Sequence, residues 1–566
     1  METIENGTRA HIRWSKELSD GEKAATKNRK KFIAECLRRN SIKCDLDKVP
    51  CVALLGSGGG VRAMIALMGT LSELGNEDLL DSIMYLCGVS GSTWCISSVY
   101  DDINWSKNIK KCENKLTEDL KKRSQTPLSV WQKILLAIEE GVCSLTILWS
   151  YMVGNHMIKE INENNLSKHK GACENGANPY PIYAAVEKSN ITNDKKNASG
   201  TWFEFTPHDA GFIDYGAFVN TEVIGSQFIK GGLTTTKAEQ TICYLRGLWG
   251  SALASEYEIK TTIKDYIYNW FFGKHEEEEE HHAETESMST CLRSCAVPVK
   301  CTCECCKSAE FIVTLSVEEL CSEAGLKELL RLEELLEECK KNGSHHMLPP
   351  AASPLVCVPE MAFLRAGSFI PSLLSSAYEK TTIVAKLLKS LAFWQWGTTH
   401  NYLYKCNTTD NLVPKELAEK EFINLIDAGL AINSAYPLVL RPERKVNLIL
   451  SFDFSAGDPF ETLKHTADYC KANKIPFPDI KVHKHEEAKP SGCYVFKGPN
   501  VPTVVHIPLF NTENCAGEIQ KYRDTFSTFK LSYGKDNVED LLKVSKLNVQ
   551  NNKNKILGEL RKAVLP

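Results

Sequence analysis

The chain has 566 residues, of which 43% are hydrophobic and 24% are charged, and its formal net charge at pH 7 is −4. This length is sufficient for a large buried core and for more than one domain. The small net charge excludes a globally basic surface, so nucleic acid is not an expected partner.

Residues 1–46 form a polar N-terminal arm, which lacks the apolar segment of a secretory signal peptide. The basic run at 27–31 and the pair Arg38 and Arg39 predict a solvated helix, and a contribution to binding anionic membranes is the second interpretation. The chain contains 22 cysteines. Without a secretory signal, these are expected to be reduced thiols in the cytosol rather than a disulfide framework.

An apolar strand is predicted at 51–55, followed by the glycine loop 56–62 and an apolar helix. A strand, a glycine loop and a helix N-terminus make an anion site, because free N–H groups and the helix dipole point at the ligand. The loop lacks the Gly-Lys-Ser/Thr of a P-loop and the acidic partner of a dinucleotide site. We therefore interpret it as an oxyanion hole.

A second apolar strand, at 83–87, leads into Gly88-Val-Ser90-Gly-Ser92. Glycines on both sides of Ser90 allow a sharp turn that exposes its hydroxyl, as in a nucleophile elbow. Ser92 stands where the G-x-S-x-G motif has its second glycine, so a plain Gly/Ser turn is equally compatible with this segment alone. Together with the preceding glycine loop, however, it predicts an acyl-transfer site.

Two aspartates in the last third of the chain are candidates for a catalytic carboxylate, and each lies at the end of an apolar strand. The predicted strand 422–426 ends in Asp427-Ala-Gly429, which suits a catalytic aspartate on a tight turn, although a plain Asx-turn is the alternative. Asp453 is a rival that lacks the following glycine turn. None of the 14 histidines lies in a motif like that of a catalytic triad, and we interpret His208 and His400 as structural.

Residues 274 to about 354 differ from the rest in composition. The acidic block 276–280 predicts disorder. Three interpretations fit the cysteines that follow: zinc binding, S-acylation of a flexible loop, or a solvated insertion without chemistry. The spacing lacks paired Cys-x₂-Cys knuckles, so no metal is expected. The six cysteines are Cys291, Cys295, Cys301, Cys303, Cys305 and Cys306.

Three motifs, at 56–63, 88–94 and 427–430, resemble the catalytic motifs of the cytosolic phospholipase A2 family. The resemblance extends from about residue 48 to 560 and is closest to the gamma-type, calcium-independent branch. Further segments that share it are WFEFTPHDAGF, GLWGSA, WGTTHNYLYK, YPLVLRP and LSFDFSAGDPFETL.

The resemblance implies an α/β fold, namely a three-layer α/β/α hydrolase core of the patatin and cytosolic phospholipase A2 type, with a cap and a lid. The catalytic domain would then occupy 47–566 after the arm. Its cap and lid region is expected at about 180–426, including a disordered acidic and Cys-rich insertion at about 274–310.

Carried over residue by residue, the resemblance implies that Ser90 is the nucleophile, Asp427 its partner in a dyad, and Gly59 and Gly60 the oxyanion hole. An aspartate can act as the base if burial raises its pKa towards the working pH. The implied reaction is hydrolysis of the sn-2 ester of a glycerophospholipid through an acyl-serine intermediate, with lysophospholipase or transacylase activity beside it. The alternative is a lipid-binding or membrane-tethering protein with weak turnover. The substrate phosphate would be held by Arg62, assisted by a second arginine that is either Arg441 or Arg444.

No cofactor is implied. The arm is too short for the calcium-dependent membrane module of many family members, and the ending 562–566 lacks the prenylation box of gamma-type members. Our hypothesis is that acylation of the cysteines at 291–306 compensates for that anchor. The expected partners are the glycerophospholipid substrate and the surface of an intracellular membrane, with which a cytoplasmic enzyme would associate peripherally.

Overall fold

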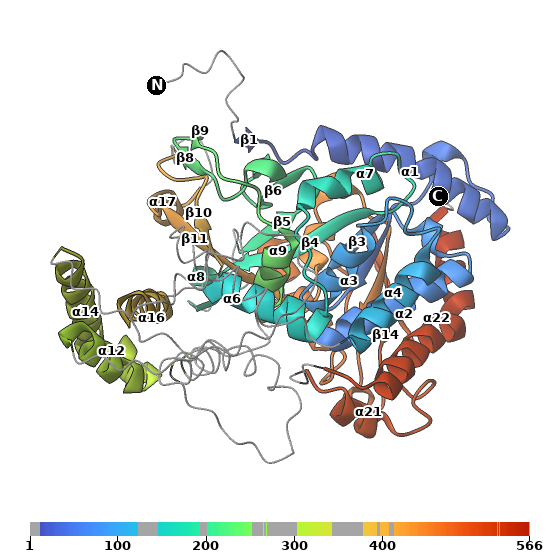
Figure 1. Cartoon of the computed structure of the whole chain (residues 1–566). Helices are drawn as coiled ribbons and strands as arrows, with labels where there is room; N and C mark the ends of the chain where they lie inside the picture. The colour runs from blue at the N-terminus through green and yellow to red at the C-terminus, as the bar shows by residue number, and fades with distance from the viewer. Residues whose placement is uncertain are drawn as a thin grey trace, which may run out of the picture. The chain divides into compact units, whose positions relative to one another are not determined.

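The computed structural model divides into two compact units (Figure 1). The first comprises 1–122, 150–253 and 396–566, and the second comprises 123–149 and 254–395. The residues that the structure describes are 12–122, 145–192, 201–251, 303–341, 377–392, 397–406, 413–528 and 532–564, with the single residues 264, 268 and 530.

The first unit is built on a twelve-stranded mixed sheet. Its central strands pair in parallel and are almost wholly buried. Parallel strands that are buried on both faces consist of continuous apolar runs, which is why the sequence predicted several of them. In spatial order these strands are β4 (Tyr180–Glu187), β3 (Tyr85–Gly88), β2 (Val52–Gly56), β12 (Leu448–Asp453) and β14 (Thr503–Pro508).

Antiparallel strands extend the sheet at both ends. Beyond β14 lies β13 (Tyr494–Phe496), and β8 (Gln227–Ile229) forms a separate hairpin with β9 (Gly232–Thr235). On the other side of β4, the strands in order are β5 (Trp202–Phe205), β6 (Asp209–Phe212), β7 (Ala217–Asn220) and β1 (Arg13–Trp14). A branch from β4 consists of β11 (Phe422–Asp427) and β10 (Thr398–His400).

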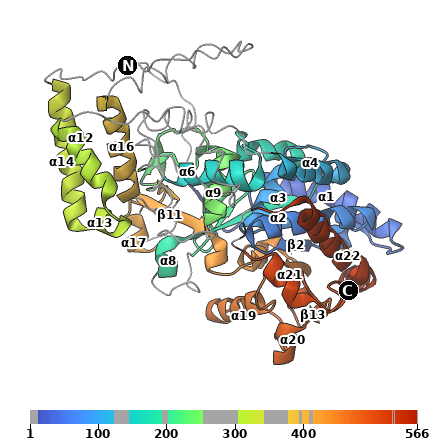
Figure 2. The same ribbon diagram turned by 60° about the horizontal axis from the view of Figure 1, so that its bottom comes forward.

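Two buried helices follow the central strands directly: α2 (Gly60–Asn76) after β2 and α3 (Gly91–Val99) after β3. The C-terminal helix α22 (Lys535–Val564) packs along α2 (Figure 1). The orange and red helices of the last third of the chain appear at the bottom of Figure 2. They are α19 (Glu461–Asn473), α20 (Lys484–Ala488) and α21 (Ile519–Thr525).

In the described part of the chain, no helix is both long and apolar enough to cross a bilayer.

Further helices are α1 (Asp20–Arg39), α4 (Ile109–Lys121), α6 (Leu145–Met152), α7 (Lys170–Cys173), α8 (Lys188–Thr192), α9 (Ile242–Trp249), α17 (Lys415–Ala418) and α18 (Tyr436–Val439).

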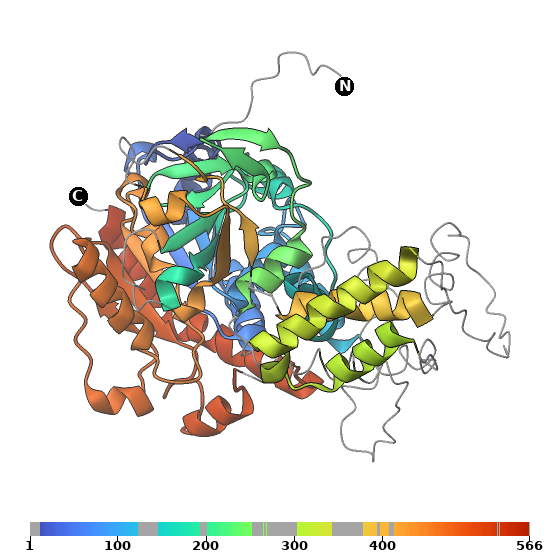
Figure 3. The same cartoon turned by 90° about the vertical axis from the view of Figure 1, so that its left-hand side faces the viewer.

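The described helices of the second unit are α12 (Glu304–Thr314), α13 (Val317–Cys321), α14 (Glu323–Lys341) and α16 (Ala377–Ala392). Helices α12, α14 and α16 pack against one another (Figure 3). Helix α13 starts at a capping box of Ser316 and Glu319, and α14 begins after Ser322. Of the predicted disordered insertion, 274–302 lies outside the described residues, whereas 303–310 includes the start of α12.

The N-terminal arm contains the predicted helix, α1, but only one face of this helix is exposed to solvent, and the other face is buried. Arg29, in the middle of the basic run, is 1% exposed. Its guanidinium donates to the carbonyl oxygens of Ala177 at 2.6 Å and Ile83 at 3.0 Å. The prediction was wrong here because a run of basic residues does not reveal which one of them is satisfied by buried carbonyl groups.

The predicted cap region, about 180–426, also differs from the observed division. Residues 180–253 belong to the first unit, since β4 pairs with β3 in the middle of the sheet. The second unit is formed instead by 254–395 with 123–149. An apolar strand in a sequence carries no mark that assigns it to one unit or the other, because that depends on its pairing partner.

Candidate active site

The ends of β3 and β11 approach each other along one edge of β4. Gly88 at the end of parallel β3 lies opposite Tyr183, and Asp427 at the end of antiparallel β11 lies opposite Ala185. The other edge of β4 is occupied by β5. A strand rises by about 3.3 Å per residue, so the two strand ends are roughly 7 Å apart along β4. The turn that carries Ser90 therefore lies beside the turn that carries Asp427.

Ser90 immediately precedes α3 with φ 52° and ψ −126°. Such a conformation is rare for a residue with a side chain and costs on the order of 1–3 kcal/mol. Thr93 supports it, because its N–H and its hydroxyl donate to the carbonyl oxygen of Ser90 at 2.9 and 2.5 Å. Ser90 thus has the strained strand-to-helix backbone of a nucleophile elbow.

The glycine loop packs directly on the serine turn. A β-carbon on Gly91 would lie 1.9 Å from the carbonyl oxygen of Gly60. The Ser92 hydroxyl donates to the carbonyl oxygen of Ser57 at 2.6 Å. Ser92, the departure from G-x-S-x-G, therefore has a role that a glycine would not fill: it ties the serine turn to the glycine loop.

Gly59 and Gly60 have φ of 148° and 60°, and α2 begins at Gly60. Only glycine adopts both conformations without strain. Within the described part of the chain, neither of their N–H groups donates a hydrogen bond. Both remain available to a ligand at the N-terminus of α2, where the helix dipole adds positive potential.

Asp427 is fully buried at the end of β11. Its Oδ1 accepts from the N–H of Gly429 at 2.8 Å, and its own N–H donates to Ser251 Oγ at 3.0 Å. The Asx-turn that the sequence offered as an alternative is therefore present, and the same turn fixes the carboxylate. Among the described residues, no hydrogen bond joins this carboxylate to the Ser90 hydroxyl. Catalytic hydrogen bonds are often long before substrate binds.

Sequence reasoning missed Asn433, which connects the turns of the site. It exchanges hydrogen bonds with Gly58: the Gly58 N–H donates to the Asn433 carbonyl at 3.0 Å, and Asn433 Nδ2 donates to the Gly58 carbonyl at 3.2 Å. Its Oδ1 lies 3.1 Å from where a β-carbon on Gly429 would be. Asn433 carries no local motif, so the resemblance of the neighbouring segment was the only signal in the sequence that could have found it.

Arg62 lies in the first turn of α2 and is 1% exposed. Its guanidinium donates to the carbonyl oxygens of Phe454 at 2.7 Å and Phe526 at 2.5 Å and to Thr528 Oγ1 at 3.1 Å. Burial lowers the pKa of Arg62 to about 10, which leaves it charged at neutral pH. Asp453 acts on this cation electrostatically, but the described residues include no carboxylate within ion-pair distance of it, and its Nη2 lies against Gly59. The loop is thus electropositive.

Arg441 and Arg444 are not brought to this site. Arg444 donates to Glu22 of α1 at 2.9 Å and to Glu204 of β5 at 2.8 Å, and Arg441 pairs with Glu204 as well. Burial opposes ionisation of Glu22, but Arg444 outweighs it and lowers the pKa of that carboxyl. Arg444 stacks on Tyr85, at the opposite end of β3 from Ser90. Two buried carboxylates, Glu22 and Glu204, are the partners of these arginines, so the structure gives no support to a phosphate contact for either one.

The residues considered as rivals have other partners. His208 is hydrogen-bonded to the Tyr180 hydroxyl at 2.8 Å, and His400 lies against the ring of Phe422. Burial lowers the pKa of both imidazoles, which favours their neutral form. Asp453 ends β12, and one of its oxygens accepts from the N–H of Ser455 at 2.8 Å.

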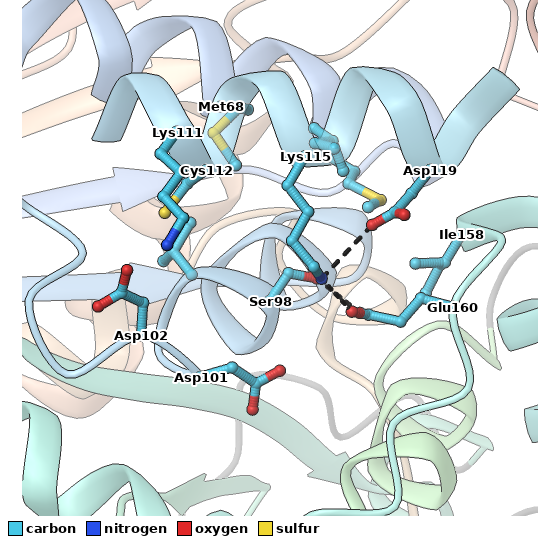
Figure 4. A pocket seen from close by; sticks show the side chains of 13 residues that line it. Met68, Ser98, Asp101, Asp102, Lys111, Cys112, Lys115, Asp119, Ile158 and Glu160 are labelled. Carbon is cyan, nitrogen blue, oxygen red and sulfur yellow. Dashed lines mark hydrogen bonds and ion pairs between the residues drawn. The ribbon is translucent and has the colours of Figure 1, made fainter. Parts of the chain in front are cut away.

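A cavity of about 190 Å³ lies along α3 (Figure 4). Lys115 points into it between Asp119 and Glu160. Burial opposes ionisation of Glu160, but Arg246 and Lys115 outweigh it and lower the pKa of this carboxyl to about 2. Arg246 also donates to Ser97 of α3 at 2.8 Å. Neither Ser90 nor Asp427 lines this cavity, and we do not assign it to the candidate site. The hydrogen bonds and ion pairs of Arg246, Glu160 and Lys115 connect α3, α4 and α9 beside it.

Comparison with known proteins decides which family this arrangement represents. Residues 52–269 match the model of the lysophospholipase catalytic domain. Human cytosolic phospholipase A2 gamma is 38% identical over 548 residues, which are 96% of this chain and 94% of the human protein. The chain belongs to the gamma-type branch of the cytosolic phospholipase A2 family. It is therefore a phospholipase of the ester-hydrolase class.

Two solved structures show the fold of this cytosolic phospholipase A2. Human GIVD cytosolic phospholipase A2 superposes with a TM-score of 0.66 at 22% identity, over 99% of this chain and 67% of that chain. The same human protein in complex with methyl gamma-linolenyl fluorophosphonate gives a TM-score of 0.63, also at 22% identity, over 100% of this chain and 66% of that one. The predicted α/β hydrolase core is confirmed.

Proposed function

We propose that this protein hydrolyses the sn-2 ester of glycerophospholipids through an acyl-serine intermediate, with Ser90 as the nucleophile and Asp427 as the base. The supporting observation is the meeting of two strand ends on one edge of β4, Gly88 opposite Tyr183 and Asp427 opposite Ala185. Family membership supplies the substrate class.

In the first half-reaction, Asp427 takes the hydroxyl proton of Ser90 as Ser90 Oγ attacks the sn-2 carbonyl carbon. The N–H groups of Gly59 and Gly60 stabilise the negative charge on the carbonyl oxygen. The carbon–oxygen bond to the glycerol then breaks, and the lysophospholipid leaves with the proton held by Asp427. In the second half-reaction water gives its proton to Asp427, attacks the acyl-serine and releases the fatty acid, while Ser90 recovers its proton.

We assign binding of the negatively charged phosphate of the substrate to Arg62. It is a buried cation without a carboxylate ion pair in the described chain, and its Nη2 lies 2.6 Å from where a β-carbon on Gly59 would be. Its three acceptors are neutral oxygens, which a phosphate oxygen outcompetes because a charge-assisted hydrogen bond is about twice as strong as a neutral one.

Three properties accompany this activity in the proposal. Turnover proceeds without calcium, since the dyad mechanism assigns no step to a metal. Lysophospholipids serve as substrates, and transacylation occurs when a lipid hydroxyl replaces water. The enzyme acts in the cytoplasm at the surface of intracellular membranes, where its substrate resides. An acyl chain as ligand is supported by the complex of the human GIVD enzyme with a linolenyl fluorophosphonate.

The test is release of fatty acid from sn-2-labelled phosphatidylcholine vesicles in the presence of EGTA. Wild type is compared with Ser90→Ala, Asp427→Asn and the matched control Asp453→Asn, an equally buried aspartate at the end of β12. We expect release by wild type and the control only. Release by Asp427→Asn but not by Asp453→Asn would mean that Asp453, and not Asp427, is the base. Binding to vesicles without release of fatty acid by any of these proteins would favour a tethering function.

A further inference from the structure

Four cysteine side chains of the second unit converge at one end of its helices. Cys303 Sγ lies 3.1 Å from Cys305 Sγ, and Cys305 Sγ lies 3.6 Å from the Sγ of Cys339. The sulfur atoms of Cys303, Cys305 and Cys306 are all within 4.8 Å of one another. The first three residues begin α12, whereas Cys339 lies in the last turn of α14. Two segments far apart in the sequence therefore contribute to one cluster.

Cys303, Cys305 and Cys306 form the compact part of this cluster, and Cys339 adjoins it through Cys305. Zinc–sulfur bonds of about 2.3 Å in a tetrahedron place the sulfur atoms about 3.8 Å apart. The observed separations of 3.1 and 3.6 Å lie near this value, and all are well above the ~2.05 Å of a disulfide. Cys305 and Cys306 are buried, each 2% exposed, which leaves them poorly accessible to an acylating enzyme.

The neighbouring thiols and burial raise the pKa of Cys305, and the dipole of α12 acts in the opposite direction. Cys303 is the N-cap of α12, with Cys305 and Cys306 in the first turn of this eleven-residue helix. The positive end of the helix dipole stabilises negative charge at these positions. Two lysines, Lys340 and Lys341, directly follow Cys339 and offset part of the charge of a tetrathiolate.

We propose that Cys303, Cys305, Cys306 and Cys339 bind a single zinc ion that ties the start of α12 to the end of α14. Binding releases the proton of each thiol and forms four zinc–sulfur bonds, with no change of oxidation state. Cys306 also contacts the Thr381 hydroxyl of α16 at 3.4 Å, so the site reaches the third helix of the bundle. A small helical unit gains stability from such a structural metal.

The sequence led us to expect no metal because Cys-x-Cys-Cys has no paired knuckle. Cys339 was not considered, since its distance along the chain hides its proximity to Cys305. Packing of α12 against α14 supplies the fourth ligand.

The experiment measures zinc in the full-length protein, purified without chelator, by mass spectrometry of the metal. We expect one zinc per wild-type chain and per Cys321→Ser chain, because Cys321 belongs to the same unit but not to the cluster. Cys339→Ser and Cys305→Ser should lose it. Cobalt exchanged into the wild type should give the thiolate charge-transfer and tetrahedral d–d absorption of a tetrathiolate site.

A second measurement uses only the wild-type protein, so that the proposal is still tested if a cysteine variant does not fold. The thiols of wild-type protein are titrated with and without a strong chelator, and the chelator should expose four additional reactive cysteines, the number in the cluster. The proposal is overturned by a metal-free wild type, by zinc retained in Cys339→Ser, or by intact-mass and peptide analysis that finds a disulfide or an acyl thioester on these four residues.

Discussion

The backbone of Gly91 rests on the carbonyl group of Gly60, so that a β-carbon on Gly91 would lie 1.9 Å from that oxygen. This contact joins the N-termini of α3 and α2, the helices that follow the candidate nucleophile and the glycine loop. Because both atoms in contact belong to backbone, neither can move aside by changing a rotamer.

Gly91→Ala should therefore abolish most of the activity. We expect at least a 100-fold fall in kcat/KM and a loss of stability of about 1–3 kcal/mol, the usual cost of overpacking. The matched control is Gly558→Ala in α22, where a β-carbon meets nothing within 4 Å. The control should gain up to about 1 kcal/mol from helix propensity and keep its activity. Thermal unfolding and ester hydrolysis check both variants, and an active Gly91→Ala would contradict the contact.

Ser251→Ala should weaken the support of Asp427. The Ser251 hydroxyl accepts the backbone N–H of Asp427, and its removal leaves a buried donor unsatisfied at a cost of about 1–3 kcal/mol. We expect kcat to fall roughly 10-fold or more while KM changes little, because the carboxylate is displaced but substrate contacts persist. The control is Ser434→Ala, since the buried Ser434 hydroxyl has no hydrogen-bond partner in the described structure. Steady-state kinetics that show equal losses for the two variants would refute this assignment.

Arg62→Lys separates a phosphate-binding role from a bracing role. If Arg62 binds the phosphate, hydrolysis of a phospholipid should fall about 10- to 100-fold more than hydrolysis of an uncharged fatty-acyl ester. If its hydrogen bonds to Phe454, Phe526 and Thr528 only brace the loop, both substrates should lose activity equally. The ratio of kcat/KM for the two substrates is the measurement, and an unchanged ratio would remove Arg62 from substrate recognition.

Glu160 should make stability depend on pH in acid. Its pKa is lowered from 4.5 to about 2 in the folded state, so its contribution is fully present above about 4.5 and is lost as the pH falls towards 2. The stability difference between wild type and Glu160→Gln should be at most about 3 kcal/mol at pH 7, and partial exposure reduces it. Urea unfolding between pH 7 and pH 3 tests this. A difference that stays constant or grows in acid would contradict the ion pairs with Lys115 and Arg246.

Glu22→Gln should destabilise the fold without a selective effect on substrate phosphate. The change leaves Arg444 with one buried carboxylate partner in place of two, and breaking such a buried ion pair costs about 3–5 kcal/mol. Lys27→Gln, on the same helix but not buried, is the control. Chemical denaturation gives the stability. A shift in the phospholipid-to-neutral-ester activity ratio would instead link this network to the substrate.

The sequence by itself determined the elements whose cause is local. Strands β2 and β3 are continuous apolar runs and β11 is a largely apolar one, and the turns at Gly60, Ser90 and Asp427 follow these strands directly. Glycine at these turns permits backbone angles that other residues avoid, so the residue types alone indicated them. For the same reason the family motifs, and with them the hydrolase core, were predictable without coordinates.

Only the tertiary structure decided what depends on pairing between distant segments. Register along β4 sets Asp427 beside the serine turn, and packing gives Arg444 to Glu22 and Glu204 rather than to a substrate. The contacts of Asn433 with Gly58 and of Cys339 with Cys305 arise in the same way. Buried charges, amides and thiols are fixed by partners that satisfy them, and those partners come from elements far away in the chain, which no local pattern encodes.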